Sequence, residues 1–308
     1  MENFSLNILG CGSATPSARH LPSCQVINFR DSLMMIDCGE GAQLSVRKMG
    51  LKFSRINHIF ISHLHGDHCL GLPGLLSTMA LHGVGGTVKV YMHREGIPVF
   101  SQLIDFVCAE RPYDLEFVEI PPQGGVLLDT HALTVEAFPL YHRIPASGFI
   151  FREKPKLRHL RGDMIKFYNV PVRDLQSIKE GADLMLDDGR VIENSRLTTD
   201  PTPSASYAYC SDTVFNPRVA DAVRGVDVIY HEATYREAEA HLAKERFHST
   251  ASQAAEIARL AGARLLILGH YSKRYPTMDG LLKEALPIFP DTIAADEGMV
   301  INLNEYAR

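Results

Sequence analysis

The sequence contains few cysteines, and no two of them have the spacing of a zinc knuckle. Six cysteines are scattered over 308 residues without a Cys-x-x-Cys pair, so neither a disulfide framework nor a thiolate metal site is indicated. They are Cys11, Cys24, Cys38, Cys69, Cys108 and Cys210. We expect buried, apolar thiols at these positions.

Long hydrophobic runs are also missing. The longest apolar runs, such as Leu265–Leu268, are far shorter than the roughly 20 residues that cross a bilayer, so no membrane span is expected. The N-terminus lacks a basic flank followed by an apolar stretch, which argues against a signal peptide. The sequence therefore predicts a cytoplasmic protein.

The sequence also has no overall excess of positive charge. The formal net charge is −5, which argues against a protein that coats nucleic acid nonspecifically, because such proteins usually display a broad basic surface. Any contact with nucleic acid must therefore be local. With 45% hydrophobic and 22% charged residues, the composition is that of a soluble globular protein with a sizeable core.

Short β-rich runs alternate with helical patterns in two series. The first series has strands at 6–9, 25–29, 33–36, 56–61, 88–91, 115–120 and 133–138, and helices at 41–49, 72–81 and 97–107. The second has strands at 207–210, 226–230, 265–268 and 299–302, and helices at 218–223, 251–261 and 278–286. Two α/β halves are predicted, with sheets inside and helices outside.

The stretch between the two series differs from both. Residues 151–200 are rich in charge, Pro and Gly, so we expect a flexible arm inserted into a single domain that spans 1–308. Its first part carries a local excess of four positive charges. The basic residues are Arg152, Lys154, Lys156, Arg158, Arg161 and Lys166, against Glu153 and Asp163. Such clusters are usually solvated surface, and a substrate contact is the alternative.

One segment concentrates ionisable side chains directly after the apolar run 56–62. It reads His63-Leu64-His65-Gly66-Asp67-His68. Alternate residues of an extended chain point the same way, so His63 and His65 can share one ion, while Asp67 and His68 can face a second. Burying these groups unpaired would cost several kcal/mol, which favours a metal site. Imidazole and carboxylate suit Zn²⁺ best, although Mn²⁺, Co²⁺ or Fe²⁺ could replace it.

Three further ligand candidates follow apolar β runs elsewhere in the chain. They are His142, Asp212 and His270. Layered α/β proteins collect active-site groups at such strand ends. The remaining histidines, among them His20, have no partner spacing and are expected at the surface or in packing.

The ordered set HxHxDH, His, Asp, His resembles the metallo-β-lactamase superfamily over nearly the whole chain. The resemblance implies an αββα sandwich that binds two zinc ions per chain. It also implies that one ion is held by His63, His65 and His142, the other by Asp67, His68 and His270, and that Asp212 bridges them. Drug-hydrolysing lactamases lack two strings found here, His231-Glu232-Ala233-Thr234 and Phe247-His248-Ser249-Thr250.

These two strings make the sequence most similar to the ribonuclease Z family. The resemblance implies an endoribonuclease that removes the 3′ trailer from precursor tRNA, leaving a 3′-hydroxyl on the tRNA and a 5′-phosphate on the trailer. It also implies a homodimer in which the arm of one subunit grips RNA bound at the other. Family members usually carry a Gly-Pro-rich signature in the arm, and residues 169–181 depart from it.

Roles within the reaction follow from the resemblance and from residue chemistry. The family assigns Asp67 as general base. The leaving 3′-oxygen needs a proton, and we expect His248 to donate it with Glu232 orienting the imidazole. RNA contacts are expected at Lys154, Lys156, Arg158 and Arg161. Two alternatives remain open: a small-molecule phosphodiesterase on the same two-zinc centre, and a catalytically silent RNA-binding relative.

Overall fold

The computed structural model describes residues 3–308, which form two compact units. The first unit contains the chain up to residue 152 together with 205–307, and the second contains 153–204. Among residues 3–308, no helix combines the length and apolar content that crossing a bilayer requires.

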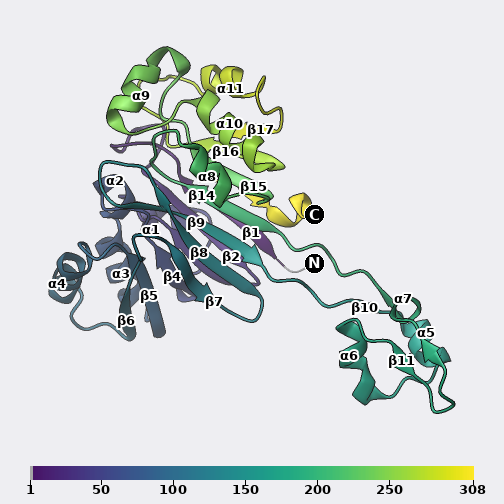
Figure 1. The fold of residues 1–308 in the computed structure, drawn as a ribbon. Coiled ribbons are helices and arrows are strands. Elements are labelled where there is room, and N and C mark those ends of the chain that lie inside the picture. The colour runs from purple at the N-terminus through teal and green to yellow at the C-terminus, as the bar shows by residue number, and fades with distance from the viewer. Residues whose placement is uncertain (1–2) are drawn as a thin grey trace. The chain divides into compact units, whose positions relative to one another are not determined.

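Two seven-stranded sheets form the centre of the first unit, and helices lie on their outer sides (Figure 1). The first sheet has the order β18 (Val300–Asn302), β1 (Phe4–Gly10), β2 (Cys24–Phe29), β3 (Ser32–Ile36), β4 (Ile56–Phe60), β5 (Gly86–Met92) and β6 (Tyr113–Glu119). The second has the order β17 (Thr292–Ala294), β16 (Leu265–Gly269), β15 (Val228–Glu232), β14 (Ser206–Cys210), β9 (Ala146–Glu153), β8 (Leu133–Leu140) and β7 (Gly125–Asp129). Strands β3 to β6 are parallel, as are β14 to β17.

The helices of the first unit pack on the two outer faces. They are α1 (Ala42–Lys48), α2 (Gly66–Cys69), α3 (Leu72–Leu81), α4 (Ile97–Val107), α8 (Pro217–Ala222), α9 (Ala240–Arg246), α10 (Ala251–Ala261) and α11 (Asp279–Ala285). Short 3₁₀ turns lie at Phe53–Arg55, Glu237–Glu239 and Leu303–Tyr306.

Alternation along the strands explains why both faces of the first sheet are apolar. In β3, Met34 and Ile36 belong to the core between the sheets, whereas Leu33 and Met35 belong to the core under α1, α3 and α4. Successive side chains of a strand point to opposite faces, so a sheet covered on both sides needs a continuous apolar run. The expected arrangement of inner sheets and outer helices is confirmed.

Strand β9 is the main element that the sequence pattern missed. It pairs with β14 in the middle of the second sheet and is buried along almost its whole length. A strand buried on both faces shows no polar and apolar alternation, so periodicity could not reveal it. Residues 151–153 therefore lie in β9, at the start of the stretch that the sequence analysis assigned to the arm.

The second unit, 153–204, has a small core of its own. Its elements are β10 (His159–Leu160), α5 (Gly162–Phe167), η2 (Val172–Asp174), α6 (Leu175–Lys179), β11 (Leu184–Met185), β12 (Val191–Ile192), α7 (Asn194–Leu197) and β13 (Thr198–Thr199). Strand β10 pairs with β13, and β11 pairs with β12. Ile178, Leu184, Ile192 and Leu197 form the buried centre.

Candidate metal centre

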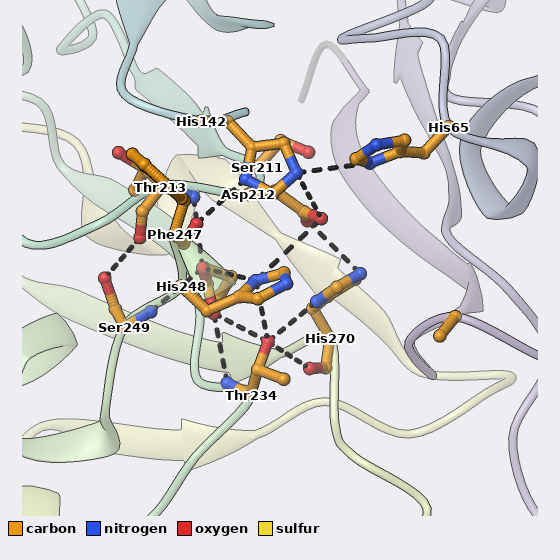
Figure 2. Close-up of polar contacts among 12 residues, drawn as sticks. His65, His142, Ser211, Asp212, Thr213, Thr234, Phe247, His248, Ser249 and His270 are labelled. Atoms are coloured by element: carbon orange, nitrogen blue, oxygen red, sulfur yellow. Dashed lines mark hydrogen bonds and ion pairs between the residues drawn. The ribbon is translucent and has the colours of Figure 1, made fainter. Parts of the chain in front are cut away.

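The ligand-rich segment lies where the chain leaves the first sheet after β4. His63 and His68 are fully buried there, and α2 begins at Gly66, so Asp67 and His68 lie in its first turn. The other candidates follow strands of the second sheet: His142 lies after β8, Asp212 after β14 and His270 after β16. Figure 2 shows the side chains of Asp212, His142, His248 and His270 converging, with His65 facing them.

Four side chains form a first group of donor atoms. Nδ1 of His65 lies 3.1 Å from Nε2 of His63 and 3.1 Å from Nε2 of His142. Oδ2 of Asp212 lies 3.5 Å from Nε2 of His63 and 3.8 Å from Nε2 of His142. The group thus contains three imidazole nitrogens and one carboxylate oxygen.

A second group of four donor atoms uses the other oxygen of Asp212. Nε2 of His68 lies 3.3 Å from Nε2 of His270. Oδ2 of Asp67 lies 3.6 Å from Nε2 of His68 and 3.4 Å from Nε2 of His270. Oδ1 of Asp212 lies 3.5 Å from Nε2 of His68 and 3.2 Å from Nε2 of His270. One carboxylate therefore joins two neighbouring donor groups.

Both groups fit a tetrahedrally coordinated cation of the zinc class. Ligand distances of about 2.0–2.1 Å place the corners of such a tetrahedron roughly 3.3 Å apart, and the observed separations cluster around that value. Oδ1 of Asp212 is buried and accepts no hydrogen bond from the described residues. A buried carboxylate oxygen without a donor is costly, and a cation would satisfy it.

Contacts behind the ligands fix which ring nitrogen faces inward. Nδ1 of His68 lies 2.7 Å from Oδ2 of Asp37, and Nδ1 of His270 lies 2.9 Å from Oγ1 of Thr234. Nδ1 of His142 donates to the backbone carbonyl of Phe247 over 2.8 Å. Such partners hold the tautomer in which Nε2 is free to bind a metal. Sequence reasoning gave Asp37, Thr234 and Phe247 no role, although Thr234 and Phe247 lie in the two strings on which the resemblance to the ribonuclease Z family rests.

Burial and charge set the protonation of the ligand histidines. Burial lowers the pKa of His63, His65 and His142, which keeps their imidazoles neutral, the form that binds metal. Burial also lowers the pKa of His68, but the carboxylates of Asp37, Asp212 and Asp67 outweigh this effect and raise it to about 10.

The turn after β1 lies against the second donor group. The backbone N–H of Ala14 donates to Oδ2 of Asp67 over 2.6 Å. Burial raises the pKa of Asp67, but His68, His270 and the Ala14 amide outweigh this and lower it, so the carboxylate is charged.

His248 and Glu232 form a buried pair at the edge of the donor groups. Nδ1 of His248 lies 3.0 Å from Oε1 of Glu232. Thr250 caps α10 through its side chain, which fixes the chain just after His248. Burial opposes charge on the imidazole, but Glu232 and then Asp212 raise the pKa of His248 to about 9. Nδ1 is thus held by Glu232, and Nε2 is left to act as a donor.

A cleft of about 840 Å³ opens above the donor groups. His65, Asp67, Asp212, His248 and His270 line its floor. Basic and aromatic side chains line its walls, namely Arg246, Lys273, Arg274 and Tyr235. The guanidinium of Arg274 lies over the ring of Tyr235 at 4.9 Å. Sequence reasoning missed this basic wall, because its residues come from separate loops that only the fold brings together.

The four basic residues expected to bind RNA lie in the second unit, and three of them pair with acidic side chains. Lys156 lies 2.8 Å from Glu153, Arg158 lies 2.8 Å from Asp200, and Arg161 lies 3.4 Å from Asp163. Lys154 accepts a hydrogen bond at its carbonyl from Ser204. Glu153 and Asp163 are already included in the local excess of four positive charges, so only the pair with Asp200 reduces it further.

Comparison with known proteins agrees with this fold. Ribonuclease Z of Parabacteroides distasonis is 49% identical over 304 residues, covering 98% of this chain and 100% of the relative. Ribonuclease Z of Porphyromonas gingivalis is 51% identical over 305 residues, covering 98% and 100%. A family model described as "Anti-Pycsar protein Apyc1" matches residues 4–100.

Solved structures show the same architecture. The short form of human tRNase Z has a TM-score of 0.69 and 26% identity, covering 97% of this chain and 99% of that one. A metallo-β-lactamase fold protein from Bacillus subtilis has a TM-score of 0.69 at 17% identity, covering 98% and 99%, which shows the fold alone.

The paired sheets and the two donor groups define a metal-dependent hydrolase of the metallo-β-lactamase fold. Within that class, the chain belongs to the ribonuclease Z family, and it is therefore a metal-dependent endoribonuclease.

Proposed function

We propose that this chain removes the 3′ trailer from precursor tRNA by hydrolysis at a centre that holds two zinc ions. The observation that carries the proposal is the pair of donor groups joined by Asp212, found in a chain about half identical to ribonucleases Z over its full length. The human relative in the comparison is named a tRNase Z, and the same substrate class is proposed here.

The ligand assignment follows the two donor groups. His63, His65 and His142 would hold one ion, Asp67, His68 and His270 the other, and Asp212 would bind both. When bound, such ions supply Lewis acidity: they lower the pKa of water from about 15.7 toward about 7 and offset charge on the phosphate. Mixed imidazole and carboxylate donors favour zinc among the common metals.

Two side chains would move the protons of the reaction. Asp67, ionised and fixed by the Ala14 amide, accepts a proton from the attacking water as the new P–O bond forms. His248 donates a proton from Nε2 to the 3′-oxygen as the P–O3′ bond breaks. Glu232 holds the imidazole in place and in its charged form. The products are RNA with a 3′-hydroxyl and a trailer with a 5′-phosphate.

RNA would lie along the basic wall of the cleft. Arg246, Lys273 and Arg274 supply positive charge beside the donor groups, in a protein whose net charge is −5. Local charge of this kind binds phosphates, and Arg274 packs its guanidinium over the buried ring of Tyr235.

The arm, 153–204, is proposed as a second RNA contact. Because Lys156, Arg158 and Arg161 have acidic partners, exposed basic residues of the arm such as Lys166 contribute as well. This role accounts for a small folded unit inserted between two strands of the hydrolase sheet.

We also propose a homodimer formed through α4. This helix buries Phe100 and Ile104, yet its outer side exposes Val99, Leu103, Phe106 and Val107. A contiguous apolar face on a soluble protein is typical of an interface. The replacement Phe106→Asp should convert the dimer to a monomer in sedimentation experiments, and a wild-type monomer would disprove this interface.

We also propose that the protein is located in the cytoplasm. Its six cysteines are free and buried, which suits a reducing compartment.

Two substrates separate the proposed function from the small-molecule alternative. The intact protein should cut precursor tRNA at the trailer and also hydrolyse bis(p-nitrophenyl) phosphate. Deleting 153–204 with a short linker should weaken RNA cleavage and flatten the salt dependence of RNA binding, by about one unit of slope for each lost phosphate contact. The diester activity should persist, because it needs only the centre.

Charge reversal in the cleft provides the matched comparison. Lys273→Glu should weaken RNA binding, whereas Arg218→Glu, at an exposed position at the start of α8, should not. Intact protein that hydrolyses the diester and ignores precursor tRNA would support a small-molecule phosphodiesterase. Protein that binds RNA and cuts neither substrate would support a silent RNA-binding relative.

A further inference from the structure

We infer a third cation site of the zinc class, outside the catalytic centre, where Cys11, His20 and Glu297 meet. The three side chains come from the end of β1, from the loop before β2 and from the turn before β18. Because these residues lie far apart along the chain, their spacing in the sequence gave no indication that they meet. The inference is independent of the proposed RNA substrate.

The donor atoms lie close together, and the separation between sulfur and nitrogen already has the value that a metal ion needs. Sγ of Cys11 lies 3.5 Å from Nδ1 of His20, which matches the separation of about 3.5 Å expected between sulfur and nitrogen in a tetrahedral zinc site. Oε2 of Glu297 lies 2.9 Å from the same nitrogen. Oδ1 of Asp296 lies 3.9 Å from it and is available as a fourth donor. A small shift of the His20 ring and a rotation of the Asp296 carboxylate would complete the coordination.

Glu297 is held in position for this role. Its Oε1 accepts the backbone N–H of Leu21 over 2.9 Å and that of Cys11 over 3.3 Å. These two hydrogen bonds aim Oε2 at the imidazole and the thiol. The carboxylate is therefore fixed by the backbone before any ion binds, which reduces the entropy lost on binding.

The local charge favours a cation. Burial raises the pKa of the Cys11 thiol, and the carboxylates of Glu297 and Asp296 raise it further. The same negative field attracts a dication, whose binding displaces the thiol proton and any proton on Nδ1 of His20. Thiolate, imidazole and carboxylate together favour zinc over magnesium or calcium.

The site has access to solvent and connects to the catalytic centre. His20 lines a cavity of about 210 Å³, and Ser13, Thr15, Ser272 and Lys273 line both this cavity and the catalytic cleft. From Cys11 the backbone runs three residues to Ala14, whose N–H holds Asp67. An ion bound to Cys11 would therefore fix the turn that positions Asp67.

Cobalt binding tests the inference directly. The two catalytic donor groups contain only nitrogen and oxygen, so a thiolate-to-Co²⁺ charge-transfer band in the near ultraviolet would report on Cys11 alone. Metal-free wild-type protein titrated with Co²⁺ should develop this band and bind about one ion more than Cys11→Ser. Cys108→Ser, which changes another buried cysteine, should keep the band.

Two further variants separate this site from the catalytic centre and from misfolding. Asp212→Ala should lose ions from the catalytic centre and keep the band. Glu297→Gln, which preserves shape, should weaken the cobalt affinity of the site at least 10-fold while circular dichroism stays unchanged. Absence of the band in wild-type protein, or its persistence in Cys11→Ser, would overturn the inference.

Discussion

His68 and Asp37 form a fully buried pair in which Nδ1 of the imidazole lies 2.7 Å from Oδ2 of the carboxylate. The same carboxylate oxygen accepts hydrogen bonds from the hydroxyls of Ser62 and Tyr209. Asp37 thus fixes the ring of His68 so that Nε2 faces Asp67 and His270. Its backbone is left-handed, with φ of 56°, a conformation that Asn also tolerates.

We expect Asp37→Asn to lower the zinc affinity of the site formed by Asp67, His68 and His270 by about 10- to 100-fold. Asn keeps the shape and the backbone conformation, so the change removes mainly the charge behind His68. Competition with a chelator that reports zinc colorimetrically measures the affinity of each ion.

Tyr209→Phe is the matched control for Asp37, because it removes one hydrogen bond to the same oxygen and leaves the charge. Its effect on zinc affinity should be smaller than that of Asp37→Asn. Equal effects of the two variants would mean that packing, rather than charge, is responsible.

Replacing Asp212 by Ala should remove most of both zinc ions and most of the activity, since its two oxygens belong to different donor groups. Elemental analysis should find about two ions per chain fewer in the variant than in the wild type, because the catalytic centre loses both of its ions. Asp221→Ala, at an exposed aspartate on α8, should change neither quantity. A metal-free protein that retains full activity would exclude the metal mechanism.

His248→Ala should leave the zinc content unchanged and slow RNA cleavage about 10²- to 10⁴-fold, the usual range for the loss of a general acid. Hydrolysis of bis(p-nitrophenyl) phosphate should suffer much less, because nitrophenolate leaves without a proton. The comparison uses kcat for both substrates. Equal losses on RNA and on the diester would exclude His248 as the proton donor.

Glu232→Gln should shift the alkaline limb of the pH profile to lower pH. The carboxylate of Glu232 helps to raise the pKa of His248 to about 9, so the imidazole carries its proton below that pH and loses it above. Removing the negative charge lowers this pKa, and the acid is lost at a lower pH. The profile of kcat/KM for RNA measures the shift, and thermal unfolding checks the fold. An unchanged limb would contradict the assignment.

Local patterns carried much of the information about this fold. Helices such as α3 and α10 lie at the expected residues because each has a continuous apolar face and clear ends. The ligand segment after β4 is equally local: donors two residues apart on an extended chain already share a direction. The central strand β9 escaped detection because burial on both faces removes the alternation that marks a strand.

The sequence alone thus indicated the α/β halves and the candidate donor residues that the fold brings together, because strand ends, helix ends and donor spacing are short-range properties. Tertiary structure decided which side chain stands behind which ligand. Asp37 lies 31 residues before His68, and Glu297 lies 277 residues after His20, yet both pairs are within hydrogen-bond distance. It also decided that Arg158 meets Asp200 and that Arg246 and Lys273 line one cleft. Such contacts depend on how sheets and loops pack, and no local pattern along the chain encodes them.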